Sequence, residues 1–107
     1  MTVHDITSAA HITASYLAGD RPVDRVFCCD LLSVAMARAP EGAAWVTVMT
    51  NANVVAVASL ADVACVILAE GYDYDPAALA AAEKGGVTLL RSSLPVYETA
   101  AAIGAGL

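Results

Sequence analysis

The sequence of 107 residues predicts a three-layer α/β/α sandwich around a largely parallel sheet of about five strands. Three observations lead to this prediction. Short apolar runs rich in β-branched residues alternate along the chain with segments of helical pattern. The connections between them are short. The runs are apolar at nearly every position, which is typical of parallel strands covered on both faces. We expect residues 1–107 to form one domain.

The first elements follow from local signals. Thr2 is expected to begin a helix, with Asp5 completing a capping box. Loose alternation over residues 12–17 predicts a strand, which ends at the turn-rich segment 18–22. Residues 26–29 (V-F-C-C) form a short apolar run that we interpret as a buried strand.

A second helix is expected directly after this strand, with Asp30 as its N-cap. The face that it buries is expected to consist of Leu31, Leu32, Ala35, Met36 and Ala39. Residues 40–42 (P-E-G) should end it, because proline and glycine do not continue a helix.

Residues 44–49 predict the next strand, and residues 50–53 have the composition of a turn before a helix. The apolar block that follows is longer than a usual strand of about five or six residues. We therefore divide it into a buried helix over 53–60 and a buried strand over 64–69, although Val54 and Val55 mildly disfavour a helix.

The last third of the chain has clear signals for where helices start and end. Asp75 and Pro76 predict the N-cap and first residue of a helix, and Gly85-Gly86 predicts its end. Residues 87–90 predict the last strand, and a C-terminal helix is expected to start at 92–95 and to end near residue 103.

The composition is unusually apolar, with 59% hydrophobic and 15% charged residues against about 45–50% and about 25% in ordinary domains. This predicts extensive burial, including contact with a partner subunit. The net charge of -6 and the scattered basic residues argue against nucleic-acid binding. Because no apolar window reaches the roughly 20 residues that a bilayer requires, and no signal-like start is present, we expect a cytoplasmic protein with reduced cysteines and no membrane partner.

Polar residues follow the predicted strands where each one ends. In a parallel sheet these positions share one edge, beside helix starts, and ligands commonly bind there. The residues are Asp30, Thr50, Asn51, Asn53, Glu70, Tyr72, Tyr74, Ser92 and Ser93. Each of them alone is also explained as a helix cap or turn residue. The sequence therefore leaves two interpretations of this edge open.

Other chemistry has less support. Cys28 and Cys29 are neighbours on a strand and point to opposite faces, so we interpret them, like Cys65, as small buried hydrophobic residues. A reactive Cys29 beside a helix start stays a minor alternative. His4 and His11 have no partners at metal-ligand spacing. The chain contains no P-loop, G-x-G-x-x-G or G-x-S-x-G motif, so we expect no cofactor, no metal and no catalytic set.

Several segments together carry a family pattern. They are D-R (24–25), D-L-L-S (30–33), M-A-R-A (36–39), A-W-V-T-V-M-T-N-A-N-V-V-A-V-A-S-L (44–60), A-C-V-I-L-A-E-G (64–71) and G-V-T-L-L (86–90). With them the sequence resembles stand-alone DRTGG-domain proteins over nearly its whole length. Asp24 and Arg25 correspond to the start of the namesake motif, whereas V-F-C-C replaces its Thr-Gly-Gly part. Bulkier side chains there would block a close backbone approach.

The resemblance implies a three-layer module similar to the N-terminal domain of HPr kinase/phosphorylase. It also implies a regulatory or assembly role, often at a dimer interface, without catalytic residues. Our leading hypothesis is therefore a non-catalytic regulatory module that acts as a homodimer or docks on a partner enzyme. The alternative is a sensor of a nucleotide or another anion, with Thr50, Asn51, Asn53, Ser92 and Ser93 as donors and Tyr72 or Tyr74 stacking on a ring. The minor alternative is a thiol-dependent enzyme.

Overall fold

The computed structural model describes residues 1–107 and contains five strands and five helices. The strands are β1 (Ile12–Tyr16), β2 (Val26–Cys28), β3 (Ala44–Thr47), β4 (Cys65–Leu68) and β5 (Leu89–Ser92). The helices are α1 (Val3–Thr7), α2 (Leu32–Arg38), α3 (Ala52–Ala61), α4 (Pro76–Gly85) and α5 (Val96–Gly104). None of these helices is long and apolar enough to cross a membrane.

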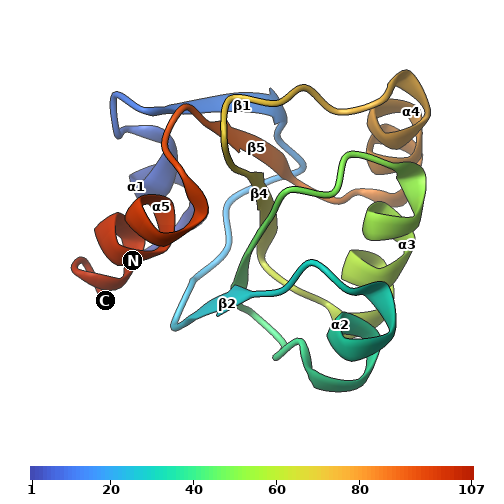
Figure 1. Ribbon diagram of the computed structural model, residues 1–107, viewed down its shortest axis with the longest axis horizontal. Coiled ribbons are helices and arrows are strands. Elements are labelled where there is room, and N and C mark those ends of the chain that lie inside the picture. The colour runs from blue at the N-terminus through green and yellow to red at the C-terminus, as the bar shows by residue number, and fades with distance from the viewer.

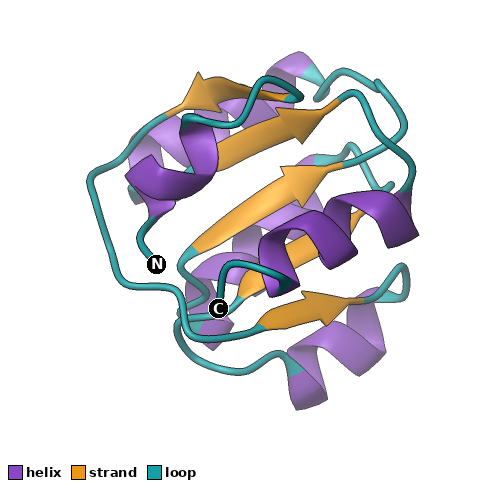
Figure 2. Ribbon diagram, turned by 90° about the vertical axis from the view of Figure 1, so that its left-hand side faces the viewer, coloured by secondary structure: helices purple, strands orange, loops and turns teal.

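The five strands form one sheet in the order β1-β5-β4-β3-β2. Strands β2 to β5 are parallel to one another, and β1 lies antiparallel to β5 at one edge, where its arrow runs opposite to the others (Figure 2). Helices α2, α3 and α4 cover one face of the sheet, and α1 and α5 cover the other (Figure 1). The predicted three-layer, largely parallel fold is confirmed.

Each face of the sheet carries its own hydrophobic core. Trp45 of β3 and Leu68 of β4 pack under α2, α3 and α4, whereas their neighbours Val46 and Ile67 pack under α1 and α5. All of these side chains are 0% exposed. Adjacent residues on a strand point to opposite faces, so a strand buried on both faces must be apolar at every position. This accounts for the continuous apolar runs in the sequence.

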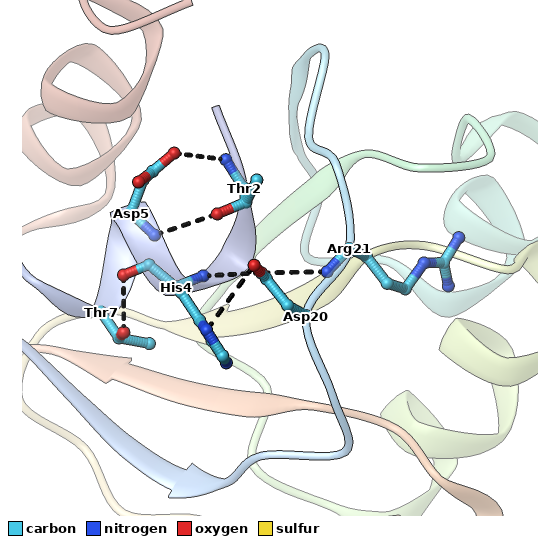
Figure 3. A network of polar contacts seen from close by, with 6 residues as sticks. All are labelled: Thr2, His4, Asp5, Thr7, Asp20 and Arg21. Atoms are coloured by element: carbon cyan, nitrogen blue, oxygen red, sulfur yellow. Dashed lines mark hydrogen bonds and ion pairs between the residues drawn. The ribbon is translucent and has the colours of Figure 1, made fainter.

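The N-terminal helix is held by a small polar network (Figure 3). The backbone N–H of Asp5 donates to Thr2 Oγ1 at 3.3 Å, and the Thr2 N–H donates to Asp5 Oδ2 at 2.8 Å, which confirms the capping box. Asp20 Oδ1 accepts hydrogen bonds from the backbone N–H groups of His4 and Arg21, each at 3.0 Å. The bond from His4 is the main reason why the pKa of Asp20 lies below its usual value.

The division of the long apolar block into helix and strand is also confirmed. α3 begins one residue before the predicted start, and Asn51 caps it by accepting the Asn53 N–H at 3.0 Å. α4 ends at Gly85, and its C-cap Gly86 has a φ of 69°, in the left-handed region that favours glycine. β5 covers residues 89–92 instead of the predicted 87–90, so Ser92 belongs to the strand.

Two predictions about β2 and α2 are wrong. β2 is an edge strand with β3 as its only neighbour, so Val26 and Phe27 are only half-buried and Cys28 is exposed. In α2 only Ala35 is buried. The other members of the expected inner face lie nearer the surface, and two of them, Leu31 and Met36, are each 59% exposed. No further layer of the chain covers this edge of the sheet.

Candidate functional site

Asp30 lies at the end of β2 but does not cap α2. The residue before that helix is Leu31, which makes no side-chain capping bond. Asp30 Oδ1 instead accepts hydrogen bonds from Thr47 Oγ1 at 2.8 Å and from the Val48 N–H at 2.9 Å. The carboxylate therefore joins the ends of β2 and β3, and the expected role as N-cap is wrong.

The polar residues after β3 also bond within the chain. Thr50 Oγ1 donates to Asp75 Oδ1 at 3.0 Å, and the Asp75 N–H donates to the Thr50 carbonyl at 3.0 Å. Asp75 is the N-cap residue of α4, as predicted, but its side chain makes no capping bond to that helix. Asn51 caps α3, while Asn53 is exposed near the start of that helix. These contacts tie the starts of α3 and α4 together.

Glu70 and Ser92 connect β4 and β5 to the last helix. Glu70 has a φ of 67°, and its Oε2 accepts the Val96 N–H at 3.2 Å, at the first residue of α5. The Ser92 hydroxyl is buried and shares a 2.7 Å hydrogen bond with Thr99 Oγ1. It also accepts the Leu94 N–H at 3.1 Å. Both side chains hold α5 on the sheet.

The two tyrosines differ in their surroundings. Tyr72 is 52% exposed, and its carbonyl accepts from Arg91 Nε at 3.0 Å. Tyr74 is buried, and its hydroxyl donates to the Leu90 carbonyl at 2.7 Å. Burial raises the pKa of Tyr74 above its usual value. Tyr74 therefore belongs to the core and its ring is not free to stack on a ligand, whereas the ring of Tyr72 is free.

The remaining predicted residues lie apart from this edge or make few contacts. Asp24 and Arg25 form an ion pair of 3.5 Å before β2, and their side chains are 69% and 60% exposed. An exposed pair of this kind contributes little to stability. Ser93 is exposed, and its backbone N–H donates to the His11 carbonyl at 3.0 Å. Most of the predicted ligand residues therefore make hydrogen bonds that join helices and strands. Among these residues, only the side chains of Asn53, Tyr72 and Ser93 make no hydrogen bond within the chain.

The cysteines do not form a common site. Cys65 is buried, as predicted, and burial raises its pKa to about 12. Cys28 is exposed, yet partial desolvation and, second, the Asp30 carboxylate raise its pKa. The Cys29 thiol donates to the Leu31 carbonyl at 3.3 Å. No group of three or more His, Cys, Asp or Glu side chains comes together in a way that could hold a metal ion.

A cavity lies at the opposite edge of the sheet, at the amino ends of β4 and β5, and a second hollow of about 380 Å³ shares Arg21 with it. The first cavity has a volume of about 290 Å³, and its lining includes Arg21, Asp62, Gly86 and Thr88. Arg21 Nη1 donates to Asp62 Oδ1 at 2.9 Å and to the Val63 carbonyl at 3.0 Å. The guanidinium thus satisfies carbonyl groups at the end of α3, where a helix favours positive charge.

Several exposed or half-buried apolar side chains belong to β2, to α2 and to the residue before α2, at the free edge of the sheet. We call this surface the β2–α2 edge and define it by Phe27, Leu31, Leu32, Val34 and Met36. Leu31 and Met36 are each 59% exposed and Val34 is 37% exposed, while Phe27 and Leu32 are partly buried. The sequence pattern assigned several of these residues to the core, since an apolar helical face has the same pattern whether it is covered by its own chain or left open.

A small polar pocket lies where β5 ends beside the start of β1. We call it the β1–β5 pocket. It has a volume of about 120 Å³, and its lining includes His11, Thr13, Gly71, Arg91, Ser92 and Ser93. His11 Nε2 is buried and has no hydrogen-bond partner. Of the lining residues, only Ser92 and Ser93 were among the predicted ligand residues. The others were missed because only the pairing of β1 with β5 brings them together.

Comparison with known proteins identifies a family and a fold. The model of the DRTGG domain family matches residues 3–105. A similar solved structure is that of the CBS and DRTGG domains of the regulatory region of Clostridium perfringens pyrophosphatase, complexed with its activator, diadenosine tetraphosphate. The TM-score is 0.73 at 14% sequence identity, over 91% of this chain and 43% of that one. A search of curated protein sequences gave no match. The similarity to the N-terminal domain of HPr kinase/phosphorylase stays a prediction.

Proposed function

Because this chain belongs to the DRTGG domain family, we propose that it is a regulatory module without catalytic activity of its own, which acts by forming a homodimer through the β2–α2 edge. The regulatory part of the proposal is supported by the family and by the place of the similar domain in the regulatory region of a pyrophosphatase. The homodimer part rests on the surface of this chain.

The observation that carries the proposal is the open apolar edge. Cys29 donates its backbone N–H to the Val46 carbonyl at 3.3 Å, so by strand alternation the N–H of Cys28 points away from β3. An unpaired strand edge beside exposed apolar side chains favours association with another chain. A second copy presents the same edge, and two such edges can meet antiparallel about a twofold axis.

Burial in a dimer would also account for the apolar composition. α2 buries only Ala35 within the chain, whereas Leu31 and Met36 are mostly exposed. Covering an apolar side chain of this size contributes about 1.5–3 kcal/mol when burial is complete. In a symmetric dimer the same side chain is covered in both copies, so this contribution counts twice. Docking of the same edge on a partner enzyme is the alternative occupant of this surface.

Sedimentation velocity over a concentration series tests the dimer, with Met36→Glu as the disrupting variant. Met36→Glu puts a charge into both halves of the interface and should weaken the dimer at least about 30-fold, since one apolar contact of about 1 kcal/mol is lost in each half. Leu79→Glu is the matched control, because Leu79 is a partly exposed residue of α4 on the far side of the helical layer. Its dimerisation should equal that of the wild type.

A wild-type chain that sediments as a monomer at every accessible concentration would contradict the homodimer. Equal weakening by Met36→Glu and Leu79→Glu would contradict the assignment of the interface to the β2–α2 edge. If the wild type is monomeric and binds a partner enzyme that Met36→Glu no longer binds, the same edge docks on that enzyme instead.

A further inference from the structure

We propose that the β1–β5 pocket binds a phosphate group, either as the free ion or as the end of a larger phosphorylated molecule. This pocket lies beside the edge formed by β1, and the β2–α2 edge lies at the other side of the sheet. The proposal is therefore independent of the homodimer, and either one can fail without the other.

The pocket has a frame held by backbone hydrogen bonds. The Ser93 N–H donates to the His11 carbonyl, and the Gly71 N–H donates to the Ser92 carbonyl, both at 3.0 Å. These bonds fix the turn before β1, the loop after β4 and the end of β5 against one another. A frame fixed before a ligand arrives lowers the entropy cost of binding.

Sheet register sets which side chains share the pocket. Thr13 lies directly opposite Arg91 in the antiparallel pair of β1 and β5, so both side chains stand on the same face. Ser92, one residue further on, points to the opposite face and bonds to Thr99 of α5. The side chains of Thr13 and Arg91 are thus neighbours on the face away from α5.

His11, which lines this pocket and also a smaller apolar one beside Asp5, carries a buried nitrogen without a partner. Its Nε2 makes no hydrogen bond within the chain, and a buried polar atom that stays unpaired is unfavourable. Buried polar atoms in native proteins nearly always have a partner, which is a bound water or ion where no protein group is present. An imidazole nitrogen that carries the proton donates to an oxyanion.

Arg91 supplies the positive charge. Its Nε donates to the Tyr72 carbonyl at 3.0 Å and its Nη2 lies 2.7 Å from Asp73 Oδ1, so the guanidinium is held in one place. Nη1 makes no hydrogen bond within the chain. A planar guanidinium with free N–H groups is suited to oxyanions such as phosphate. Asp73 does not line the pocket, although it neutralises part of this charge.

The chemistry of the lining favours an anion over a cation. The side chains available are an imidazole, a guanidinium and the hydroxyls of Thr13 and Ser93, and no carboxylate lines the pocket. The volume of about 120 Å³ is several times what a single water requires, so a phosphate-sized ion can enter. β4 leads into α4 on one face and β5 into α5 on the other, and ligands of α/β sheets bind where successive connections diverge in this way.

A ¹H–¹⁵N NMR titration with inorganic phosphate tests the proposal, with sodium chloride at equal ionic strength as the reference. We expect saturable shifts of the amides around 10–13, 71 and 91–93 and of the His11 ring nitrogen. Arg91→Gln should weaken binding at least tenfold. Arg38→Gln is the matched control, because it makes the same change at an exposed arginine of α2 and should leave the affinity unchanged.

Asp73→Asn is a second variant, which tests the role of the Arg91 guanidinium even if Arg91→Gln does not fold. Removing the carboxylate that competes for the guanidinium should tighten phosphate binding several-fold. Parallel titrations with pyrophosphate and adenosine monophosphate identify the source. Equal affinities for all three probes indicate that the pocket recognises the phosphate group alone. Tighter binding of pyrophosphate or adenosine monophosphate indicates that the pocket holds the phosphate end of a larger molecule. An absence of saturable shifts with all three probes would overturn the proposal, as would equal affinities in Arg91→Gln, Asp73→Asn and Arg38→Gln.

Discussion

Substitution of Asp30 by alanine separates a structural role from a ligand role at the carboxyl edge of the sheet. Asp30 Oδ1 accepts two hydrogen bonds, from Thr47 Oγ1 at 2.8 Å and from the Val48 N–H at 2.9 Å. Because Thr47 is 0% exposed, the substitution leaves its hydroxyl proton without an acceptor, while Thr47 Oγ1 still accepts the Met49 N–H at 3.2 Å. The alternative interpretation, a free carboxylate waiting for a ligand, predicts no loss of stability.

The size of the effect follows from these contacts. A hydrogen bond to a charged group contributes about 1.5–3 kcal/mol, and an unpaired buried hydroxyl costs about 1–3 kcal/mol. Since Asp30 itself is exposed and water replaces part of the interaction, we expect Asp30→Ala to lower the free energy of unfolding by about 2 kcal/mol. In a chain of 107 residues this lowers Tm by roughly 8 °C or more. Asp30→Asn keeps an acceptor oxygen and should lose about half as much.

Urea unfolding followed by circular dichroism measures these differences. Asp24→Ala is the control, because that exposed carboxylate contacts only Arg25, at 3.5 Å, and its loss should change stability by less than about 0.5 kcal/mol. A double-mutant cycle with Thr47→Val isolates the hydrogen bond from any effect of charge near α2, and we expect a coupling of about 1 kcal/mol. Additive effects of Asp30→Ala and Thr47→Val, or equal stabilities of Asp30→Ala and Asp24→Ala, would contradict a structural role of the Asp30 carboxylate.

Three further predictions concern titrating groups. Tyr74→Phe removes the hydroxyl that donates to the Leu90 carbonyl, and it should lower the free energy of unfolding by about 1 kcal/mol at neutral pH. The pKa of Tyr74 is raised in the folded state. In urea titrations, wild-type stability should therefore fall more steeply than that of the variant above about pH 10. Burial raises the pKa of Cys65 to about 12, so Ellman's reagent should label exposed Cys28 in the native protein and Cys65 only after unfolding, and labelling of native Cys65 would contradict its burial. The hydrogen bond from the His4 N–H lowers the pKa of Asp20. The Asp20 carboxylate therefore stabilises the fold above the ordinary value of 3.8, and this contribution is lost as the pH falls through the lowered pKa. Thermal scans should find Asp20→Asn less stable than the wild type near neutral pH and equal to it in strong acid.

The sequence predicts the layered architecture well because that architecture follows from local signals. Continuous apolar runs identify strands covered on both faces, and caps such as Thr2 and Gly86 identify where helices begin and end. The division of the apolar block into α3 and β4 follows from strand length alone. These inferences need no knowledge of which elements become neighbours in space.

The errors arise where neighbours decide the outcome. Strand order places β2 at an edge, so a run that resembles a buried strand is half-open and the apolar face of α2 is largely uncovered. The polar residues after each strand do lie at one edge, but contacts such as that of Asp30 with Thr47 engage most of them. The β1–β5 pocket joins His11 to Arg91 across most of the chain, and no local pattern marks such a pair.

Hydrogen–deuterium exchange can detect association through the β2–α2 edge and can also locate it, because it reports on individual amides. If two copies meet at this edge, amides of residues 26–38, above all the outward N–H of Cys28, exchange more slowly as the protein concentration rises. Met36→Glu should show no such change, and β1 should not change in either protein. Exchange rates over residues 26–38 that are identical at all concentrations, and equal in the wild type and Met36→Glu, would contradict association through this edge.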